Sequence, residues 1–241
     1  MSLLLMIGRL SAIRRSAIIH DLIADEQLDI LALSETWMCT DTLNCIKRDI
    51  APEGFSVLHV HRSGTTGRPW SGGGLAIIYR STLDVSVHPR FEELCTSTSL
   101  CEIQLARLGR ASSSITIANI YRPLGAMGDF YDDLATLISS ICLEAGERLC
   151  GDLNCADSQG RINGTLTDIC NAYSLCQYVE VPTRGDNILD VLAADNRKTV
   201  NDTRMSDAGL VSDQKLIPCK ITTSCNRQPV RHVFRNIKAV D

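Results

Sequence analysis

The stretch LDILALSETW, residues 28–37, joins a short apolar run to a polar end. The apolar part has the length of a buried β-strand and is too short for a typical helix. Before it, apolar side chains at positions 18, 19, 22 and 23 recur with helical spacing, which predicts a helix over residues 12–25. In α/β folds, catalytic side chains gather at the carboxyl ends of strands. The sequence therefore predicts that Glu35 lies at the functional edge of a sheet.

Outside this stretch, strands and helices follow one another without strict alternation. Strands are predicted at 1–7, 75–80, 83–88, 100–107, 114–120, 147–150, 178–181, 188–193 and 216–222. Helices are predicted over 165–173 and over 130–141, the latter with Asp129 as N-cap and with Phe130, Leu134, Leu137, Ile138 and Ile141 on one side. Several strand pairs look like hairpins, which favours an α/β (α+β) fold of stacked mixed sheets over a doubly wound parallel sheet. We expect one domain over 1–222 and a linker over 223–241.

Composition excludes several classes of protein. The chain is 44% hydrophobic with a mean hydropathy of +0.03, and no segment approaches the ~20 apolar residues of a membrane span. The eleven cysteines are scattered, odd in number and without a CxxC pair, which argues against both a disulfide scaffold and a zinc site. The first seven residues lack the basic region of a signal peptide. We therefore expect an intracellular protein, nuclear or cytoplasmic, with free cysteines and no membrane partner.

The net charge of −4 argues against a protein that is held on nucleic acid by charge alone. If DNA is the substrate, bound cations must offset part of the negative field near the site.

Acidic residues stand at or just beyond the ends of predicted strands. They are Glu35, Asp152, Asp190 and Asp213, and Asn154 follows two residues after Asp152. Carboxylate oxygens are the ligands that Mg²⁺ prefers, usually one or two with waters and phosphate completing the shell. A single acidic residue at a strand end is more often a cap or a solvated turn. From the residues alone, the chain is an α/β or α+β protein with a possible metal-dependent chemistry.

Six segments, in order along the chain, resemble the successive motifs of the endonuclease/exonuclease/phosphatase superfamily. They are LDILALSETW at 28–37, GGGLAIIYR at 72–80, IANIYRP at 117–123, GDLN at 151–154, LDVLAAD at 189–195 and VSDQKLI at 211–217. The residues of these segments and the closing stretch VRHVFRNIKAVD look most like the apurinic-endonuclease-like domain of non-LTR retrotransposons, which precedes a reverse transcriptase. The resemblance implies a four-layer αββα sandwich, with two mixed β-sheets face to face, helices outside, and an active site built from loops at one edge.

The resemblance also implies a role for each matching position. Glu35 matches the family's metal-binding glutamate and Asp213 a metal-side aspartate, with Mg²⁺ or Mn²⁺ as the cofactor. Tyr121 matches the tyrosine that contacts the scissile phosphate. Asp152 matches the aspartate that activates water or protonates the leaving group, and Asn154 is its phosphate-orienting partner.

The last motif departs from the family. The family has Ser-Asp-His where this chain has Ser212, Asp213 and Gln214, and Asp190 matches the carboxylate that orients the missing histidine. A glutamine cannot carry a proton or a positive charge at neutral pH. General acid–base catalysis typically contributes ~10²–10⁴-fold, so we expect impaired chemistry. Ser212 and Arg122, which follows the motif tyrosine, are expected to bind substrate.

Two further positions lack the family's polar groups. Gly8 stands nearest the place of an asparagine after the first strand, and Ile188 stands where a threonine usually precedes the Leu-Asp motif. Losses that cluster at the site while the scaffold motifs persist suggest a decayed element copy.

Three functions stay open at this point. The first is a Mg-dependent, phosphodiester-hydrolysing endonuclease that nicks DNA for target-primed reverse transcription, impaired by Gln214. The second is a catalytically inactive, nucleic-acid-binding remnant of such a domain. The third is a small-molecule phosphatase of the same superfamily, although its signature segments differ from IANIYRP. The expected partners are DNA and a downstream reverse transcriptase region, and we expect a monomer.

Overall fold

The structure is a computed structural model. It describes residues 2–9, 16–38, 42, 44–61, 73–95, 100–109, 114–125, 127–141, 147–195, 200–207, 212 and 214–222. The predicted linker over 223–241 lies outside these residues, so the domain boundary at 222 stays a prediction.

Six strands form the first sheet, in the order β11-β12-β1-β2-β4-β3. Their bounds are Ser2–Arg9 for β1, Ile30–Ser34 for β2, Phe55–Val60 for β3, Leu75–Arg80 for β4, Val200–Asn201 for β11 and Ile217–Thr222 for β12. Strands β1 and β2 run parallel, and the other neighbours run antiparallel. The predicted strand at 28–33 is thus β2, at the centre of a mixed sheet.

A second sheet has the order β5-β6-β7-β8-β10-β9. Its strands are β5 (Val85–Val87), β6 (Glu102–Leu108), β7 (Ile115–Tyr121), β8 (Glu147–Asp152), β9 (Leu175–Gln177) and β10 (Asp190–Asp195). Only β7 and β8 pair in parallel. Both sheets are therefore mixed, as the resemblance implied.

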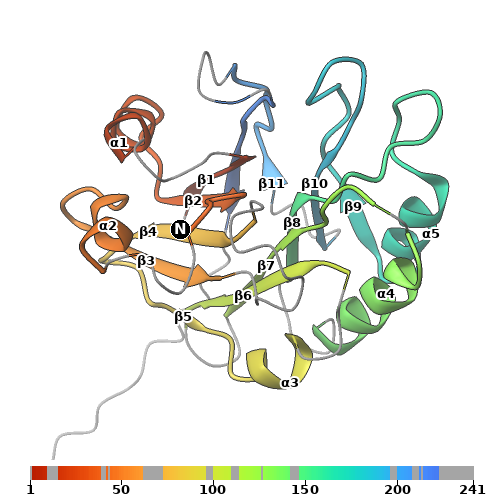
Figure 1. The fold of residues 1–241 in the computed structure, drawn as a ribbon, viewed down its shortest axis with the longest axis horizontal. Helices are drawn as coiled ribbons and strands as arrows, with labels where there is room; N and C mark the ends of the chain where they lie inside the picture. The colour runs from red at the N-terminus through yellow and green to blue at the C-terminus, as the bar shows by residue number, and fades with distance from the viewer. Residues whose placement is uncertain are drawn as a thin grey trace, which may run out of the picture.

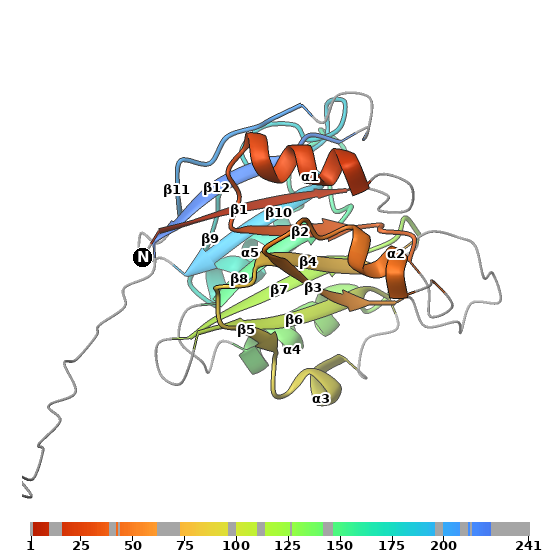
Figure 2. The same ribbon diagram turned by 90° about the vertical axis from the view of Figure 1, so that its left-hand side faces the viewer.

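Helices cover the outer faces of the two sheets (Figure 1). The helices are α1 (Ser16–Asp25), α2 (Asn44–Asp49), α3 (Phe91–Cys95), α4 (Phe130–Ile141) and α5 (Gly164–Ala172). Helices α1 and α2 lie over the first sheet, where Figure 2 shows them facing the viewer, and α4 and α5 lie against the second. This is the expected four-layer αββα sandwich. None of these described helices is long and apolar enough to cross a membrane.

The buried apolar residues form three clusters, one between the two sheets and one between each sheet and its helices. In β2, Ile30 and Ala32 join the apolar cluster between the sheets, whereas Leu31 and Leu33 join the cluster under α1. Successive side chains of a strand point to opposite faces, so a strand covered on both sides is apolar throughout. The burial pattern of β2 is accordingly continuous, which explains the uninterrupted run in its sequence.

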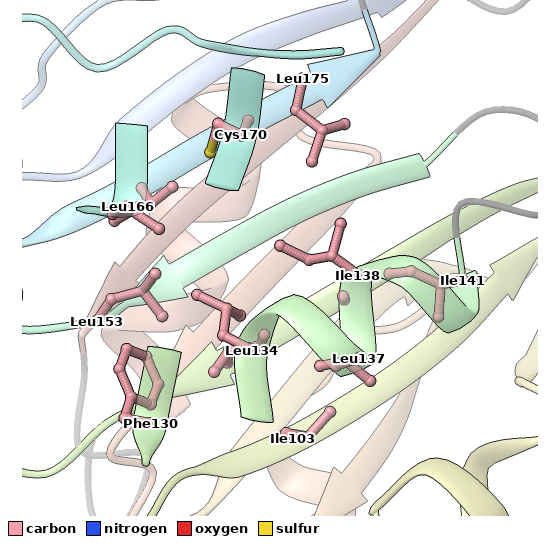
Figure 3. Packing of buried hydrophobic residues seen from close by; sticks show 14 of the residues in the cluster. Ile103, Phe130, Leu134, Leu137, Ile138, Ile141, Leu153, Leu166, Cys170 and Leu175 are labelled. Carbon is pink, nitrogen blue, oxygen red and sulfur yellow. The ribbon is translucent and has the colours of Figure 1, made fainter. Parts of the chain in front are cut away.

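Helix α4 confirms the prediction made from its apolar spacing. Its buried residues are Phe130, Leu134, Leu137, Ile138 and Ile141. Figure 3 shows these side chains packed over the second sheet, beside Ile103 and Leu153 and close to residues of α5. Positions three and four residues apart share one helix face, so the amphipathic stripe alone was enough to identify this element.

The strand predicted at 178–181 is wrong, because β9 ends at Gln177. The side-chain oxygen of Gln177 accepts hydrogen bonds from the backbone amides of Tyr178, at 3.0 Å, and of Leu192 on β10, at 3.0 Å. A side-chain amide thereby takes the place of the next carbonyl in the ladder, and the regular pairing stops there. Four further elements, β3, β11, α2 and α3, were not predicted from the sequence.

Candidate active site

Four polar residues form one row across the second sheet. Strand register pairs Asp190 with Asp152, Asp152 with Tyr121, and Tyr121 with Glu102. Residues paired in this way place their side chains on the same face of a sheet. Leu192, two residues after Asp190, belongs to the apolar cluster between the sheets, so the row faces the first sheet. Asp190, Asp152 and Tyr121, which come from three of the six segments, therefore lie in one line with Glu102.

Burial makes this row unusual. Asp152 and Asp190 are both 0% exposed, and Tyr121 is 5% exposed. Two carboxyl groups on neighbouring strands repel one another when both are charged, and burial adds a desolvation cost. Such a pair persists only where hydrogen bonds, a proton or a cation offset these costs.

Glu35 joins the row from the opposite sheet. It follows the last residue of β2 and is 8% exposed. The phenol of Tyr121 donates a hydrogen bond to Oε1 of Glu35, across 86 residues of chain. This contact brings the first acidic motif to the same edge as Asp152 and Asp190.

A tight bend aims Glu35 into this position. Glu35 and Trp37 both have left-handed backbone conformations, with φ of 52° and 60°. The amide of Thr36 donates to the carbonyl of Gly74 at 3.1 Å, and the amide of Trp37 donates to that of Gly73 at 2.8 Å. The turn at Gly73 and Gly74 thus holds the bend from the side.

Gly74 is required at this turn. Its φ is +84°, and a Cβ there would lie 2.8 Å from Oγ1 of Thr36 and 3.1 Å from the carbonyl oxygen of Met38. Only glycine combines that conformation with so close an approach.

Glu102 is a site residue that the sequence analysis missed. Its Oε2 accepts a hydrogen bond of 2.5 Å from the backbone amide of Gly74. Glu102 is also the register neighbour of Tyr121. One carboxylate therefore ties the Gly74 turn, which holds Glu35, to the row on the second sheet.

The missed signal lies in the alternation of β6. In the sequence, the apolar residues Ile103 and Leu105 alternate with Glu102 and Gln104, a pattern typical of a strand with one buried face. In the structure Ile103 and Leu105 pack with α4, whereas Ala106 and Leu108 pack between the sheets. Glu102 shares this second inward face, and no periodicity of the chain distinguishes it from a solvated one.

A second polar row lies one step deeper between the sheets. The side-chain amide of Asn119 donates to the carbonyl of Leu33 at 3.1 Å and to Oε1 of Gln104 at 3.3 Å. Gln104 donates in turn to the carbonyl of Leu58 at 2.9 Å. Because Leu33 lies two residues before Glu35, these bonds fix the end of β2 against the second sheet.

Asp152 is held through both of its carboxylate oxygens. Oδ1 accepts from the backbone amide of Asn154 at 3.1 Å, and Oδ2 accepts from Nε2 of Gln214 at 2.9 Å. Gln214 is 2% exposed, and its Oε1 has no hydrogen-bond partner among the described residues. The backbone amide of Gln214 donates to Oγ of Ser212 at 3.1 Å. The family's last motif thus reaches Asp152 here through an amide.

Arg122 supports the loop that follows β8. Its guanidinium donates from Nε to the carbonyl of Leu153 at 2.8 Å and from Nη2 to that of Asn154 at 2.6 Å. The side chain of Asn154 donates back to the carbonyl of Arg122 at 2.7 Å. These bonds hold Asn154, whose φ is 48°, in its left-handed conformation. The observed role of Arg122 is thus positional, and a direct contact with substrate stays a prediction.

Thr183 is a second residue that the sequence analysis missed. Its Oγ1 accepts hydrogen bonds from the backbone amides of Leu189, at 3.1 Å, and Asp190, at 3.3 Å. The resemblance pointed to a threonine just before the Leu-Asp motif, where this chain has Ile188. The fold brings another threonine hydroxyl to the start of β10.

The structure places most of the predicted site residues together. Contacts or register join Glu35, Tyr121, Asp152, Asn154, Asp190 and Gln214, and Ser212 joins through the backbone of Gln214. Asp213 lies outside the described residues, so the predicted pairing of Glu35 with Asp213 is not described. Within the described part of the chain, no group of three or more His, Cys, Asp or Glu side chains could hold a metal ion.

The oxygen chemistry at this edge nevertheless suits Mg²⁺, which commonly takes only one or two carboxylates. Glu35, Asp152 and the partnerless Oε1 of Gln214 supply hard oxygen donors and no sulfur.

Several solved structures share this fold. The endonuclease domain of TRAS1, a telomere-specific non-LTR retrotransposon, has a TM-score of 0.67 at 14% identity, covering 92% of this chain and 99% of that one. The AP endonuclease LMAP from Leishmania major has a TM-score of 0.69 at 13% identity, covering 91% and 87%. The 3′-5′ exonuclease NExo from Neisseria meningitidis has a TM-score of 0.64 at 14% identity, covering 90% and 99%.

No family model and no curated protein match the sequence. The structural likeness shows that this chain has the same fold as these three proteins, in agreement with the fold that the six segments predicted. The three are an endonuclease domain, an AP endonuclease and a 3′-5′ exonuclease.

Proposed function

We propose that this chain is the endonuclease domain of a non-LTR retrotransposon and that it hydrolyses phosphodiester bonds in DNA with Mg²⁺ or Mn²⁺. One observation carries the proposal: the hydrogen bond from Tyr121 to Glu35 joins the two sheets beside the buried Asp152–Asp190 pair. A stable fold has no need for three carboxylates at one sheet edge. A metal-dependent phosphodiesterase does, because a cation and a water must be held against one phosphate.

Glu35, together with Asp213, would hold the metal ion, which when bound polarises the phosphoryl oxygen and stabilises the leaving alkoxide. The hydrogen bond from Tyr121 fixes one oxygen of Glu35 in this arrangement. Tyr121 would contact the scissile phosphate beside Glu35.

Asp152 is the group that would orient the attacking water or protonate the leaving oxygen. Its carboxylate is fixed by the amide of Asn154, and Asn154 is itself locked by Arg122. A carboxylate in one fixed orientation suits the role, because proton transfer requires hydrogen-bond distance and alignment.

Gln214 sets the expected rate. It donates to Asp152 from the position that the family gives to histidine, but an amide cannot deliver or accept a proton at neutral pH. We infer that the chain cuts DNA slowly, with a deficit on the order of 10²–10⁴-fold.

The same hydrogen bond favours the second candidate, a nucleic-acid-binding remnant without activity. With both of its oxygens engaged by protein donors, Asp152 is less available to a water molecule. A chain that keeps the polar row of the second sheet but has Gln214 in place of the histidine fits either an impaired enzyme or an inactive one. A small-molecule phosphatase is the third candidate, and nothing in the described site favours it over DNA.

The test is a supercoiled-plasmid nicking assay with Mg²⁺ or Mn²⁺, run against EDTA and against Asp152→Ala. Slow nicking that EDTA and the substitution both abolish supports the enzyme. DNA binding without nicking, even in the Gln214→His variant, supports the remnant. Strong nicking that Asp152→Ala leaves unchanged would show that the chemistry lies elsewhere. The downstream reverse transcriptase region, the monomeric state and the intracellular location belong to the same proposal.

A further inference from the structure

Trp37 is an exposed aromatic residue at the edge that carries the candidate site. It is 51% exposed and lies two residues after Glu35. The exposed large apolar side chains of the described residues are Ile18, Trp37, Ile46, Val87, Leu124 and Val181. Three of these lie two positions from a site residue in the sequence. Trp37 follows Glu35, Leu124 follows Arg122, and Val181 precedes Thr183. In sequence, exposed apolar side chains thus flank three of the site residues.

The backbone conformation of Trp37 is unfavourable as well as its exposure. Its φ of 60° lies in the left-handed region, where a bulky side chain is strained. The hydrogen bond to the carbonyl of Gly73, at 2.8 Å, holds it there. Neither exposure of an indole ring nor this conformation stabilises the fold. Strain of this kind persists where the surrounding structure enforces it, and it clusters at functional sites.

The charge of the chain indicates what the indole ring would bind. At a net charge of −4, the protein gains little from attraction to the phosphates of DNA. Stacking of a base on an aromatic ring supplies affinity that does not depend on charge, and it tolerates any sequence because every base has a flat face. A strand whose scissile phosphate lies at Glu35 has its next bases within reach of the same loop.

We propose that Trp37 stacks on an unpaired nucleobase next to the scissile phosphate and so determines which DNA the site accepts. This inference rests on the proposed function, because it takes DNA as the ligand. It predicts a preference for strands that are single or locally unpaired beside the cut, since a base within a duplex offers its face only to its neighbours.

Tryptophan fluorescence tests the proposal directly. The chain has two tryptophans, so the Trp70→Phe variant leaves Trp37 as the only one. We would titrate this protein, with Ca²⁺ in place of Mg²⁺, with a single strand of thymidine and with an abasic strand of equal length. The expected result is quenching by the thymidine strand and none by the abasic strand.

Affinity is measured in parallel by the anisotropy of labelled strands. Trp37→Ala should weaken binding of the thymidine strand by roughly 5- to 150-fold, and Trp37→Phe should weaken it much less. Neither substitution should change binding of the abasic strand. Val87→Ala is the matched control, because Val87 is also 51% exposed but lies on β5. Unchanged thermal unfolding midpoints would show that all variants fold.

Two outcomes overturn the inference in different ways. If both strands bind equally, or if Trp37→Ala behaves like Val87→Ala, DNA binds but Trp37 contacts no base; the ring would then cover another part of the protein or a partner protein. If no labelled single strand binds to any variant, the inference fails, whereas the proposed function is decided separately by the nicking of plasmid DNA, which is a duplex.

Discussion

The side-chain amide of Gln214 donates a hydrogen bond of 2.9 Å to Oδ2 of Asp152, across 62 residues of chain. Both residues are almost fully buried, at 2% and 0% exposure. The resemblance matched Asp190 to the carboxylate that orients the family's histidine, whereas the hydrogen bond recorded for the Gln214 side chain goes to Asp152. A neutral donor therefore stands against the carboxylate on which the proposed chemistry depends.

Gln214→His should raise the rate of plasmid nicking, because an imidazole can carry the proton that the amide cannot. The gain should be part of the ~10²–10⁴-fold that general acid–base catalysis contributes, since Gly8 and Ile188 still lack the family's polar groups. Gln214→Ala is the matched variant, which removes the hydrogen bond to Asp152 without adding an acid or base. A Gln214→His rate no higher than that of Gln214→Ala would refute this role.

Glu102 should act on metal activation through the turn that holds Glu35. In the Gln214→His background, Glu102→Ala should raise the Mg²⁺ concentration needed for half-maximal nicking, because the amide of Gly74 loses its acceptor. Glu102→Gln keeps an acceptor oxygen and should restore most of the activation. Glu92→Ala, on an exposed position of α3, is the control. Equal Mg²⁺ dependence in all three would leave Glu102 a merely structural residue.

Gly74→Ala should destabilise the chain more than Gly54→Ala. The two glycines have nearly equal φ values of +84° and +82°, so both substitutions carry the same backbone strain. Only at Gly74 would the new Cβ meet Oγ1 of Thr36 at 2.8 Å, whereas nothing lies within 4 Å at Gly54. We expect an additional loss of about 1–3 kcal/mol, as for overpacking elsewhere, measured by urea unfolding. Equal losses would mean that the turn moves freely away from Thr36.

The cysteines should differ strongly in reactivity. The six whose side chains are described form no disulfide bond, and of these Cys45 is exposed whereas Cys155, Cys170 and Cys219 are buried. Burial and the nearby Cys176 raise the pKa of Cys170 to about 11, so at pH 8 only about a thousandth of it is thiolate.

Iodoacetamide at pH 8, followed by peptide mapping, should therefore label Cys45 well before Cys170. Raising the pH toward 11 should speed labelling of Cys170. In urea this difference should disappear, because it depends on burial. Rapid labelling of Cys170 in the native protein would contradict the packing of α5 against the second sheet.

Local sequence patterns were sufficient to predict most of the helices and strands and some of the candidate site residues. The buried stripe of α4 was predicted residue by residue, since helical period is a property of consecutive positions. Glu35, Asp152 and Asp190 were predicted at strand ends because short apolar runs stand beside them in the sequence. The order of the six segments predicted the fold. In each case the information lies within a few residues of the feature.

Contacts between distant segments were decided by the tertiary structure alone. The alternation of β6 gives Glu102 no mark of an inward position, because a second sheet covers a face that solvent would otherwise cover. The end of β9 depends on where the amide of Gln177 meets β10, and the partner of Gln214 depends on which carboxylate the folded chain brings within 2.9 Å. A sequence specifies which side chains must be buried, but which polar groups then meet is settled only when sheets from distant parts of the chain close on one another.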